Sequence, residues 1–260
     1  MRIWVYTICY NEQHFVRHFL SAYSEAERII AYDNQSTDNT CEMLSRDPRV
    51  EIRINDSGNE IRDDLYLSIK NNCWKEARGQ ADWVIIADFD EVFCMAYRNQ
   101  NNEAIFSLDL NNPHNEGYTV IKPYGYNMVS LDAPLGADGH PFLHCQNGVY
   151  HWPQEKPCAF RPDKITETNY YPGCHGMNAE GEVNIYNRPE YKLLHFKLWN
   201  INHYLDRMRL YSSRISAINR NQGWGEHYLW PIERHEKAFR DAFAASKNLF
   251  EILRTEKIYV

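Results

Sequence analysis

The segment Asp82–Phe93 (DWVIIADFDEVF) holds the residue types in this chain that are best suited to chemistry. An apolar run over residues 83–87 ends in the acids Asp88, Asp90 and Glu91. Such a run is typical of a buried strand, and packing gives no reason for three acids directly after it. Open α/β sheets bind ligands at the carboxyl ends of their strands, so the acids stand where a site is expected.

The chemistry that fits these acids is the binding of a hard divalent cation that carries a phosphate-bearing substrate. Carboxylates two residues apart on an extended chain point to opposite faces, so one metal takes both directly only where the chain turns. A solvated acidic strand end has the same composition and stays open as the alternative.

The elements that position these acids alternate between strand and helix in the first half of the chain. Short apolar runs predict four strands, at residues 3–8, 28–32, 50–54 and 84–87. Helices are expected between them, the first with Asn11 as its N-cap, a short one capped by Thr37 or Asp38, and one near residues 61–78. This alternation predicts an α/β fold with a mostly parallel, doubly wound sheet flanked by helices.

Right-handed crossovers between these strands determine which loops meet. The ends of the first, second and fourth strands are placed along one rim of the sheet. Residues 9–12, 33–38 and 88–91 are therefore expected to converge.

The second half of the chain is less regular. Residues 118–123 and 191–197 are predicted strands, whereas residues 133–190 are rich in Pro, Gly, His and aromatic residues and are expected to form functional loops. Two helical stripes follow, from Tyr204 to Ile218 and from Phe239 to Leu253. Both are predicted to face the core, and the second could instead lie on a membrane surface.

Composition narrows the function classes. The chain has 260 residues and a formal net charge of −7, which argues against a nucleic-acid binder. No window approaches the ~18 consecutive apolar residues of a spanning helix, and the start MRIWVYTICYNE lacks the pattern of a signal peptide. Seven cysteines without tight paired spacing suit a reducing compartment, so a cytoplasmic protein is expected. The 18 tyrosines and 7 tryptophans are typical of sugar-handling sites as well as of packed cores.

Three motifs stand at the predicted rim: Tyr10-Asn11-Glu12, residues 33–40 (DNQSTDNT), and Asp88-Phe89-Asp90. Their order and spacing resemble the family 2-type glycosyltransferases with the GT-A fold, in the subgroup with Asp-x-Asp-Glu followed by an aromatic residue. In the second motif Asn34 stands where the family has a second acid, and Gln35 where it has glycine. The likeness covers residues 1–125 well and the remainder only loosely, through KPCAFRP, GCH, LLHFK and HYLDRMRLYSSR.

The resemblance implies a single GT-A domain over residues 1–260. Residues 1–125 would form the nucleotide-sugar and metal-binding half, residues 126–199 a loop-rich acceptor half, and residues 200–260 the C-terminal helices. It also implies a nucleotide-diphosphate sugar donor (UDP or GDP above others), a Mn²⁺ or Mg²⁺ cofactor, and a glycan or glycolipid acceptor.

Site roles follow from the same resemblance, position by position. Tyr10 would stack on the nucleobase with Asn11 beside it, and Asp33 would hydrogen-bond the edge of the base. Arg62 would be a further base or phosphate contact, and Lys197 could reach a phosphate. The implied metal ligands are Asp88, Asp90 and His195, with Asp88 also near the ribose. GT-A enzymes commonly complete the metal shell with a histidine late in the chain, for which His195 is the first candidate and His175 the second. His175 is also placed with Asp90 in the catalytic set.

Other charged residues of the loop-rich half leave choices open. Arg161 and Lys164 could add positive charge at the diphosphate or clamp an acidic acceptor, and surface solvation explains both equally well. A base for an inverting reaction could be Asp138, Glu155 or Asp163, and the sequence selects none of them.

Three other interpretations compete with the transferase. A Mg²⁺-dependent phosphatase would use Asp88 as its nucleophile, although its motif normally stands near the N-terminus. A non-catalytic carbohydrate-binding protein would not need the acids. A zinc site could draw on a region whose spacings fit no CxxC pattern, with the candidate ligands Cys145, Cys158, Cys174, His144, His151 and His175. We expect a metal-dependent glycosyltransferase, in the cytoplasm or at the inner face of a membrane.

Overall fold

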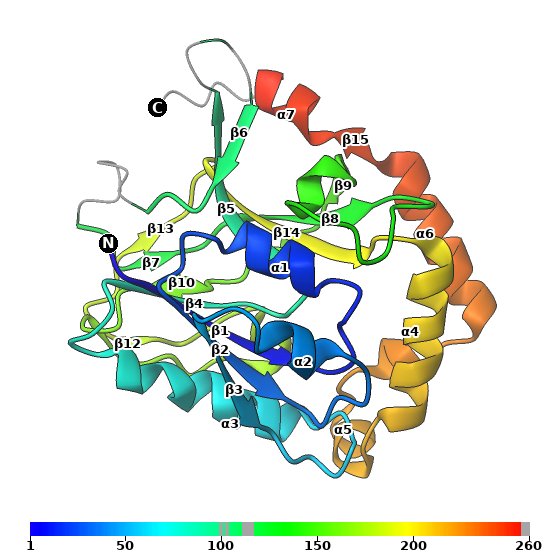
Figure 1. Ribbon diagram of the computed structural model, residues 1–260, viewed down its shortest axis with the longest axis horizontal. Helices are drawn as coiled ribbons and strands as arrows, with labels where there is room; N and C mark the ends of the chain where they lie inside the picture. The colour runs from blue at the N-terminus through cyan, green and yellow to red at the C-terminus, as the bar shows by residue number, and fades with distance from the viewer. Residues whose placement is uncertain (99–100, 102–103, 111–116, 256–260) are drawn as a thin grey trace.

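The four apolar runs of the first half form neighbouring parallel strands in the computed structural model, which describes residues 1–98, 101, 104–110 and 117–255 (Figure 1). They are β1 (Ile3–Cys9), β2 (Arg28–Asp33), β3 (Val50–Ile54) and β4 (Trp83–Ile86). Their order is β4-β1-β2-β3, and each neighbouring pair is parallel. Short strands extend the sheet beyond β4: β10 (Ala159–Phe160), β7 (Val120–Ile121) and β13 (Ile185–Tyr186).

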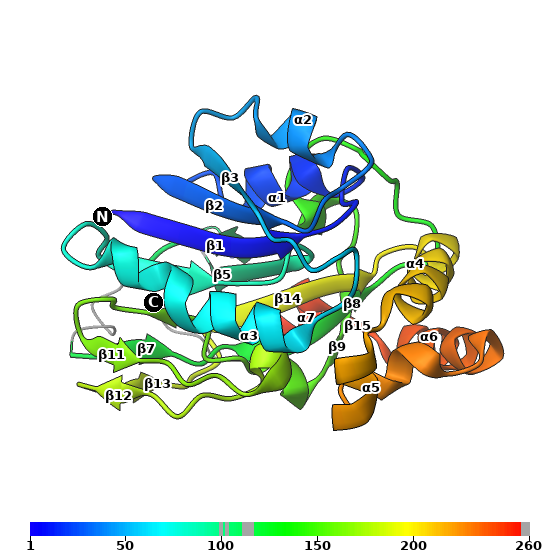
Figure 2. The ribbon, with the colours of Figure 1, turned by 90° about the horizontal axis from the view of Figure 1, so that it is seen from below.

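Helices cover both faces of this sheet (Figure 2). They are α1 (Val16–Ala22) and α2 (Thr40–Leu44) on one face, and α3 (Asp63–Asn72) with the 3₁₀ helix η1 (Cys73–Ala77) on the other. The alternation of side chains along β1 explains the arrangement: Ile3 is buried in one cluster with Phe19 of α1, and Tyr6 in another with Trp74 of η1. The predicted α/β fold with a parallel, doubly wound sheet is confirmed.

A second sheet, which the sequence analysis does not anticipate, begins at the acid motif. Its order is β15-β9-β8-β14-β5-β6. The strands are β5 (Glu91–Arg98), β6 (Ala104–Ser107), β8 (Tyr124–Val129), β9 (Asn147–Tyr150), β14 (Tyr191–Leu198) and β15 (Lys247–Asn248). Because β4 ends at Ile86 and β5 starts at Glu91, the motif is the turn that joins the two sheets. Of the two strands predicted in the second half, one is β14 and the other shrinks to β7.

The region 133–190 contains only short elements, as the sequence predicts. Besides β9, β10 and β13 these are η3 (Pro141–Leu143), η4 (Trp152–Gln154), β11 (Ile165–Glu167), η5 (Pro172–Cys174) and β12 (Glu180–Gly181).

Each predicted helical stripe near the C-terminus is divided in two. The first becomes α4 (Ile201–Arg214) and α5 (Ala217–Gln222), because the Ser216 side chain accepts from the Asn219 amide and starts a new helix. The second becomes α6 (Ile232–Ala245), β15 and α7 (Leu249–Thr255), and η6 (Glu226–Leu229) precedes it. Tyr204 and Phe239 share one buried cluster, so the stripes do face the core. None of the described helices combines the length and the apolar character needed to cross a membrane.

The prediction that Asn11 caps the first helix is wrong. Helix α1 begins at Val16, and its N-cap residue makes no side-chain hydrogen bond. Asn11 adopts a left-handed φ of 53°, and its Oδ1 accepts from the Thr37 amide at 2.7 Å and the Asp38 amide at 3.3 Å. The side chain therefore fastens the loop after β1 to the loop after β2, which leaves it unavailable as a cap.

Tyr23, the C-cap residue of α1, ties that helix to the start of β5. Its fully buried hydroxyl donates to the Glu91 carbonyl and accepts from the Phe93 amide, each at 3.0 Å. The contact holds the strand that follows the acid motif against the first layer of helices.

Replacing Tyr23 with Phe should lower the free energy of unfolding by about 1–3 kcal/mol, because a buried carbonyl and a buried amide each lose their partner. Urea denaturation measures this value. Tyr171→Phe is the matched control, because Tyr171 is 56 % exposed, and it should change stability by less than about 0.5 kcal/mol. Equal stability of the two variants would show that the Tyr23 hydroxyl does not anchor β5.

Candidate active site

The three loops that the sequence places at one rim do meet there. The Asn34 amide donates to the Cys9 carbonyl at 2.9 Å, and the Ala87 amide donates to the Tyr6 carbonyl at 3.1 Å. Glu12 and Asp90 line a common cavity of about 20 Å³, together with residues of α4. The convergence follows from the parallel order of β4, β1 and β2 and confirms the prediction made from topology.

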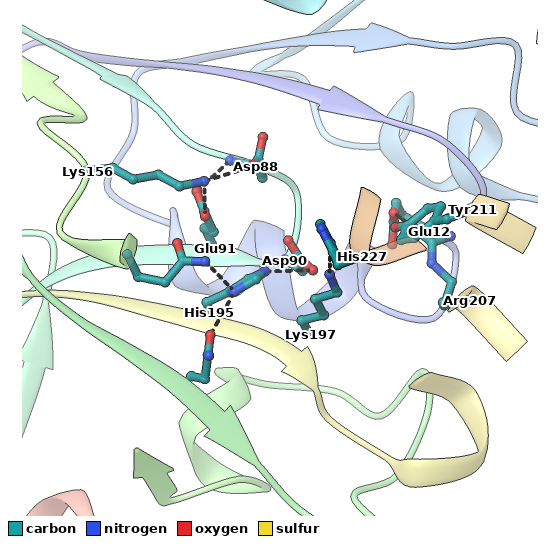
Figure 3. A network of polar contacts seen from close by, with 12 residues as sticks. Glu12, Asp88, Asp90, Glu91, Lys156, His195, Lys197, Arg207, Tyr211 and His227 are labelled. Carbon is teal, nitrogen blue, oxygen red and sulfur yellow. Dashed lines mark hydrogen bonds and ion pairs between the residues drawn. The ribbon is translucent and has the colours of Figure 1, made fainter. Parts of the chain in front are cut away.

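Asp90 faces His195 across the junction of the two sheets (Figure 3). Strand β14 runs antiparallel to β5 with His195 opposite Glu91, and the Phe196 amide donates to the Asp90 carbonyl at 2.7 Å. This register leaves 3.3 Å between Asp90 Oδ2 and His195 Nε2. Burial opposes ionisation of Asp90, but the charge and hydrogen bond of His195 outweigh it and lower the pKa of Asp90 to about 2.

The other ring nitrogen of His195 lies beside two amide side chains, only one of which can bond it in a given tautomer. Its Nδ1 lies 3.0 Å from Asn127 Oδ1 on β8 and 2.8 Å from Gln154 Nε2 on η4. When Nδ1–H donates to Asn127, the lone pair of Nε2 points to the side of Asp90. This is the arrangement of a metal-binding histidine, in which a neighbouring oxygen fixes the tautomer.

The Asp90–His195 pair fits a divalent cation that also binds phosphate. A carboxylate and an imidazole at this separation can share one ion, and Mg²⁺-type sites with few protein ligands complete their shell with water and substrate phosphates. Within the part of the chain that the structure describes, no three His, Cys, Asp or Glu side chains come together closely enough to hold a metal. The zinc interpretation therefore has no support among those residues.

Asp88 is engaged elsewhere. Lys70 Nζ lies 2.5 Å from its Oδ1. Lys156 Nζ lies 2.9 Å from its Oδ2 and also reaches Glu91 Oε1 at 2.5 Å (Figure 3). Burial opposes ionisation of Asp88, but Lys156 and Lys70 together hold its pKa well below the usual range. The implied ligand set of Asp88, Asp90 and His195 is thus not assembled as a cluster, and only two of its three members meet.

Helix α4 closes the same edge with a buried ion pair. Arg207 pairs with Glu12, contacts the Tyr211 hydroxyl, and donates to the carbonyls of Tyr10 at 3.0 Å and Asn11 at 2.9 Å. The guanidinium therefore hydrogen-bonds two carbonyls of the loop after β1 and also compensates the charge of Glu12 in that loop.

Lys197 lies near Asp90. It lines the same cavity, and its Nζ lies 3.4 Å from His227 Nε2 and 4.9 Å from the centre of the Tyr228 ring. Burial lowers the pKa of Lys197 to about 8, although the negative charge of Asp90 opposes the shift. A cation held in this way is available to an anionic ligand.

The residues expected to contact the nucleotide are at the rim but have partners of their own. Arg214 places its guanidinium carbon 3.2 Å from the centre of the Tyr10 ring. Asp33 accepts from the Ser36 amide at 3.0 Å, and Arg62 makes a two-pronged contact with Asp64 at 2.8 and 2.7 Å. Their roles toward a base stay predictions.

Arg161 and Lys164 do not belong to the site. Phe160 pairs with Val84, and Arg161 lies over the ring of Trp83, which begins β4. Lys164 pairs with Glu182 at 2.9 Å. Both residues lie toward the amino end of β4, whereas the acids follow its carboxyl end, so the structure does not bring them beside the acids.

His175 and the three base candidates are differently placed. His175 Nδ1 contacts the Pro153 carbonyl at 2.6 Å, one residue before the Gln154 that touches His195. Glu155 follows Gln154 directly and accepts from the Tyr150 hydroxyl at 2.6 Å. Asp138 pairs with Arg17, and Asp163 accepts from the Gly79 amide, so both are engaged away from the Asp90–His195 pair.

Sequence reasoning missed the partners of the acids. Lys70 stands on α3, Arg207 on α4, and Gln154 and Lys156 in the loop region, with no spacing that links them to the motif. KPCAFRP, which begins at Lys156, and HYLDRMRLYSSR, which contains Arg207, are singled out by the sequence only as whole segments.

Neither a protein-family model nor a curated protein matches this sequence. Solved structures that resemble it include glucosyl-3-phosphoglycerate synthase from Mycobacterium tuberculosis in complex with Mn²⁺, UDP and glucosyl-3-phosphoglycerate, at 15 % identity and a TM-score of 0.28 over 48 % of this chain and 44 % of that one. Another is mannosyl-3-phosphoglycerate synthase from Rubrobacter xylanophilus, at 15 % identity and a TM-score of 0.32 over 48 % and 40 %. The aligned part is less than half of each protein, and similarity at this level carries no conclusion about function.

Replacing Arg207 with Met should lower the free energy of unfolding by about 3–5 kcal/mol, because the buried carboxylate of Glu12 loses its guanidinium partner and keeps only His14 Nε2 at 3.7 Å. Guanidinium denaturation measures the loss. Arg209→Met is the control on the same helix. Arg209 and its partner Asp206 are both largely exposed, so the free energy of unfolding should change by less than about 1 kcal/mol.

The double variant Glu12→Gln/Arg207→Met removes both charges and should recover part of the loss. If Arg207→Met is as stable as the Arg209→Met control, Arg207 does not anchor the loop after β1.

Proposed function

We propose that the protein is a metal-dependent glycosyltransferase that moves a sugar from a nucleotide-diphosphate sugar to a glycan or glycolipid acceptor. The observation that carries the proposal is the Asp90–His195 pair, placed at the carboxyl edge of a parallel sheet where the loops after β1, β2 and β4 meet. A carboxylate and an imidazole at the ligand-binding edge of an open α/β sheet suit an ion that carries a diphosphate.

The donor is proposed to be a UDP or GDP sugar that lies along this edge. Tyr10 would offer one ring face to the base, since Arg214 covers the other. Asp33, at the end of β2, and Arg62, on the loop after β3, flank the same edge. The GT-A resemblance of the motifs supports this placement, and the two lysines on Asp88 argue that its role differs from direct metal binding.

A bound Mn²⁺ or Mg²⁺ would neutralise the charge that develops on the departing diphosphate. The residues of the chain act around it. Asp90 holds a negative charge at the site, and Asn127 orients His195 by accepting from its Nδ1–H. Lys197, partly buried and cationic, would stabilise the anionic leaving group, which is the kind of preorganised charge that usually contributes most to such a reaction.

The acceptor is proposed to enter from the loop-rich half. Trp152 is 72 % exposed and Tyr171 56 % exposed, on the two turns that meet where His175 contacts the Pro153 carbonyl. Exposed aromatic faces next to a transfer site suit the apolar faces of sugar rings. Glu155, in the same loop, is the best-placed of the three acids for a base in an inverting reaction.

Thermal unfolding with UDP, GDP, dTDP or CMP, each with Mn²⁺ or with EDTA, tests the proposal. One diphosphate should stabilise the protein in the presence of Mn²⁺ by ~2.7 kcal/mol at a hundredfold excess over its dissociation constant, and EDTA should remove the effect. The phosphatase interpretation would be favoured by a different result. In that case no nucleotide stabilises the protein, and the protein shows a phosphatase activity that Asp88→Asn abolishes.

The Asp90→Asn variant should lose the Mn²⁺-dependent part of the nucleotide response, with the affinity for the diphosphate falling by about tenfold or more. Isothermal titration measures it. Asp82→Asn is the matched control, because Asp82 stands at the other end of β4, is 41 % exposed and pairs with Arg2. Full metal dependence in the Asp90 variant would contradict the assignment of Asp90 as a ligand.

A further inference from the structure

Residues 131–145, between β8 and β9, form a strap that joins α1 to the start of α4. At the α4 side, Trp199 Nε1 donates to the Pro134 carbonyl at 3.0 Å, and Asn200 Nδ2 donates to the Ala133 carbonyl at 3.3 Å. Asn200 is the N-cap residue of α4, and its side chain accepts from two amides of the first turn. The strap therefore supports the beginning of the helix that closes the candidate site.

His18 of α1 holds the strap from the other side. Its Nδ1 lies 2.7 Å from the Gly139 carbonyl. Because a carbonyl oxygen only accepts, Nδ1 carries the proton of the neutral ring and Nε2 carries the lone pair. The ring is fully buried against Phe15 and Trp199, and Nε2 has no hydrogen-bond partner among the described residues. A second proton on this ring would create a buried N–H group without an acceptor.

His140 of the strap meets the same obstacle. Its Nδ1 accepts from the Phe142 amide at 3.2 Å and in this way caps η3. An N–H group faces this nitrogen, so Nδ1 cannot take a proton while the hydrogen bond lasts. Burial lowers the pKa of His140 to about 4, and the nearby His18 acts in the same direction. Burial also lowers the pKa of His18.

The charges around the two rings do not compensate a second proton. The titratable and charged groups that face them from α1 and from the strap are His14, Arg17, Asp138 and His144. Asp138 is the one acid of this set, and its side chain is 84 % exposed and pairs with Arg17 at 2.9 Å. From the junction of β14 and α4, the ring in contact with His18 is that of Trp199, which carries no charge.

We propose that the strap is an acid-sensitive switch, closed while His18 and His140 are neutral and opened by a second proton on either ring. Opening separates the Gly139 carbonyl from α1 and the Ala133 carbonyl from the N-cap of α4, so this edge of the site loosens in acid. The inference does not depend on the proposed function, because it concerns the closure of the edge whatever ligand the edge binds.

The direction of the pH dependence follows from the two histidines. In the open strap both rings regain the ordinary histidine pKa of about 6.5, which is higher than their pKa in the closed strap. The closed state is therefore fully favoured above about pH 7. Below about pH 6.5 each histidine lowers the closing equilibrium constant by about tenfold per pH unit, until the pH reaches the pKa of the closed state.

Hydrogen exchange, expressed as protection factors at pH 7 and pH 5, tests the switch. The strap amides of Gly136 and Leu143, both hydrogen-bonded in the closed state, should lose about tenfold or more of their protection at pH 5. The Tyr204 amide in the first turn of α4 should lose protection with them. The Ile29 amide of β2 should not, because it donates within the core sheet region to the Arg49 carbonyl.

The double variant His18→Asn/His140→Asn removes both titrating rings and can keep both hydrogen bonds. The new amide at position 18 can donate to the Gly139 carbonyl, and the one at position 140 can accept from the Phe142 amide as an N-cap. Its strap should keep at pH 5 the protection that it has at pH 7. His144→Gln is the matched control on the strap, because His144 is half buried and its Nε2–H donates to a carbonyl, and it should behave like wild type.

Equal protection of the wild-type strap at the two pH values would overturn the proposal. So would a loss in the double variant as large as that in wild type. An equal loss at the Ile29 amide would show general unfolding in acid in place of a local switch. A Tyr204 amide that stays protected while the strap opens would overturn the link to α4.

Discussion

Asp90 and His195 meet because β14 pairs with β5 in one register, and the rest of the site depends on that pairing. The register places His195 opposite Glu91 and lets the Phe196 amide donate to the Asp90 carbonyl. A shift of one residue would turn His195 to the other face of the second sheet and separate it from the acid. Parallel pairing of β14 with β8 adds Asn127 beside His195, so the same ladder also orients the imidazole.

Charge compensation decides what the acids at this edge can do. Glu12 is neutralised by Arg207 and Asp88 by two lysines, and these contacts join the loops to α3, α4 and the loop region. Asp90 differs, because its partner is an imidazole that can exchange a proton for a metal. The edge therefore contains acids that maintain the structure and one acid that is suited to a ligand, although all belong to the same short motifs.

The sequence predicted the first half of the fold well, since Val5, Ile30 and Ile85 lie in apolar runs whose strand character is local. The convergence at the rim followed from topology, and His195, which the resemblance singled out in LLHFK, does lie beside Asp90. The partners of the acids could not be found in this way. Lys156 and Arg207 reach the motif only through tertiary packing, and nothing local distinguishes them from surface cations. Arg161 lies over Trp83 instead of beside the acids, because a basic residue in a loop-rich region carries no sign of which end of the sheet it occupies.

The central claim is that Asp90 and His195 bind a divalent cation together with a nucleoside diphosphate. Anomalous diffraction at the manganese edge, from crystals grown with Mn²⁺ and the diphosphate that stabilises the protein, tests it directly. The account predicts one peak about 2.0–2.3 Å from a carboxylate oxygen of Asp90 and from Nε2 of His195, with phosphate oxygens on its remaining side. A peak bound by Asp88 in place of the lysines, or a diphosphate bound with no metal at Asp90, would contradict it.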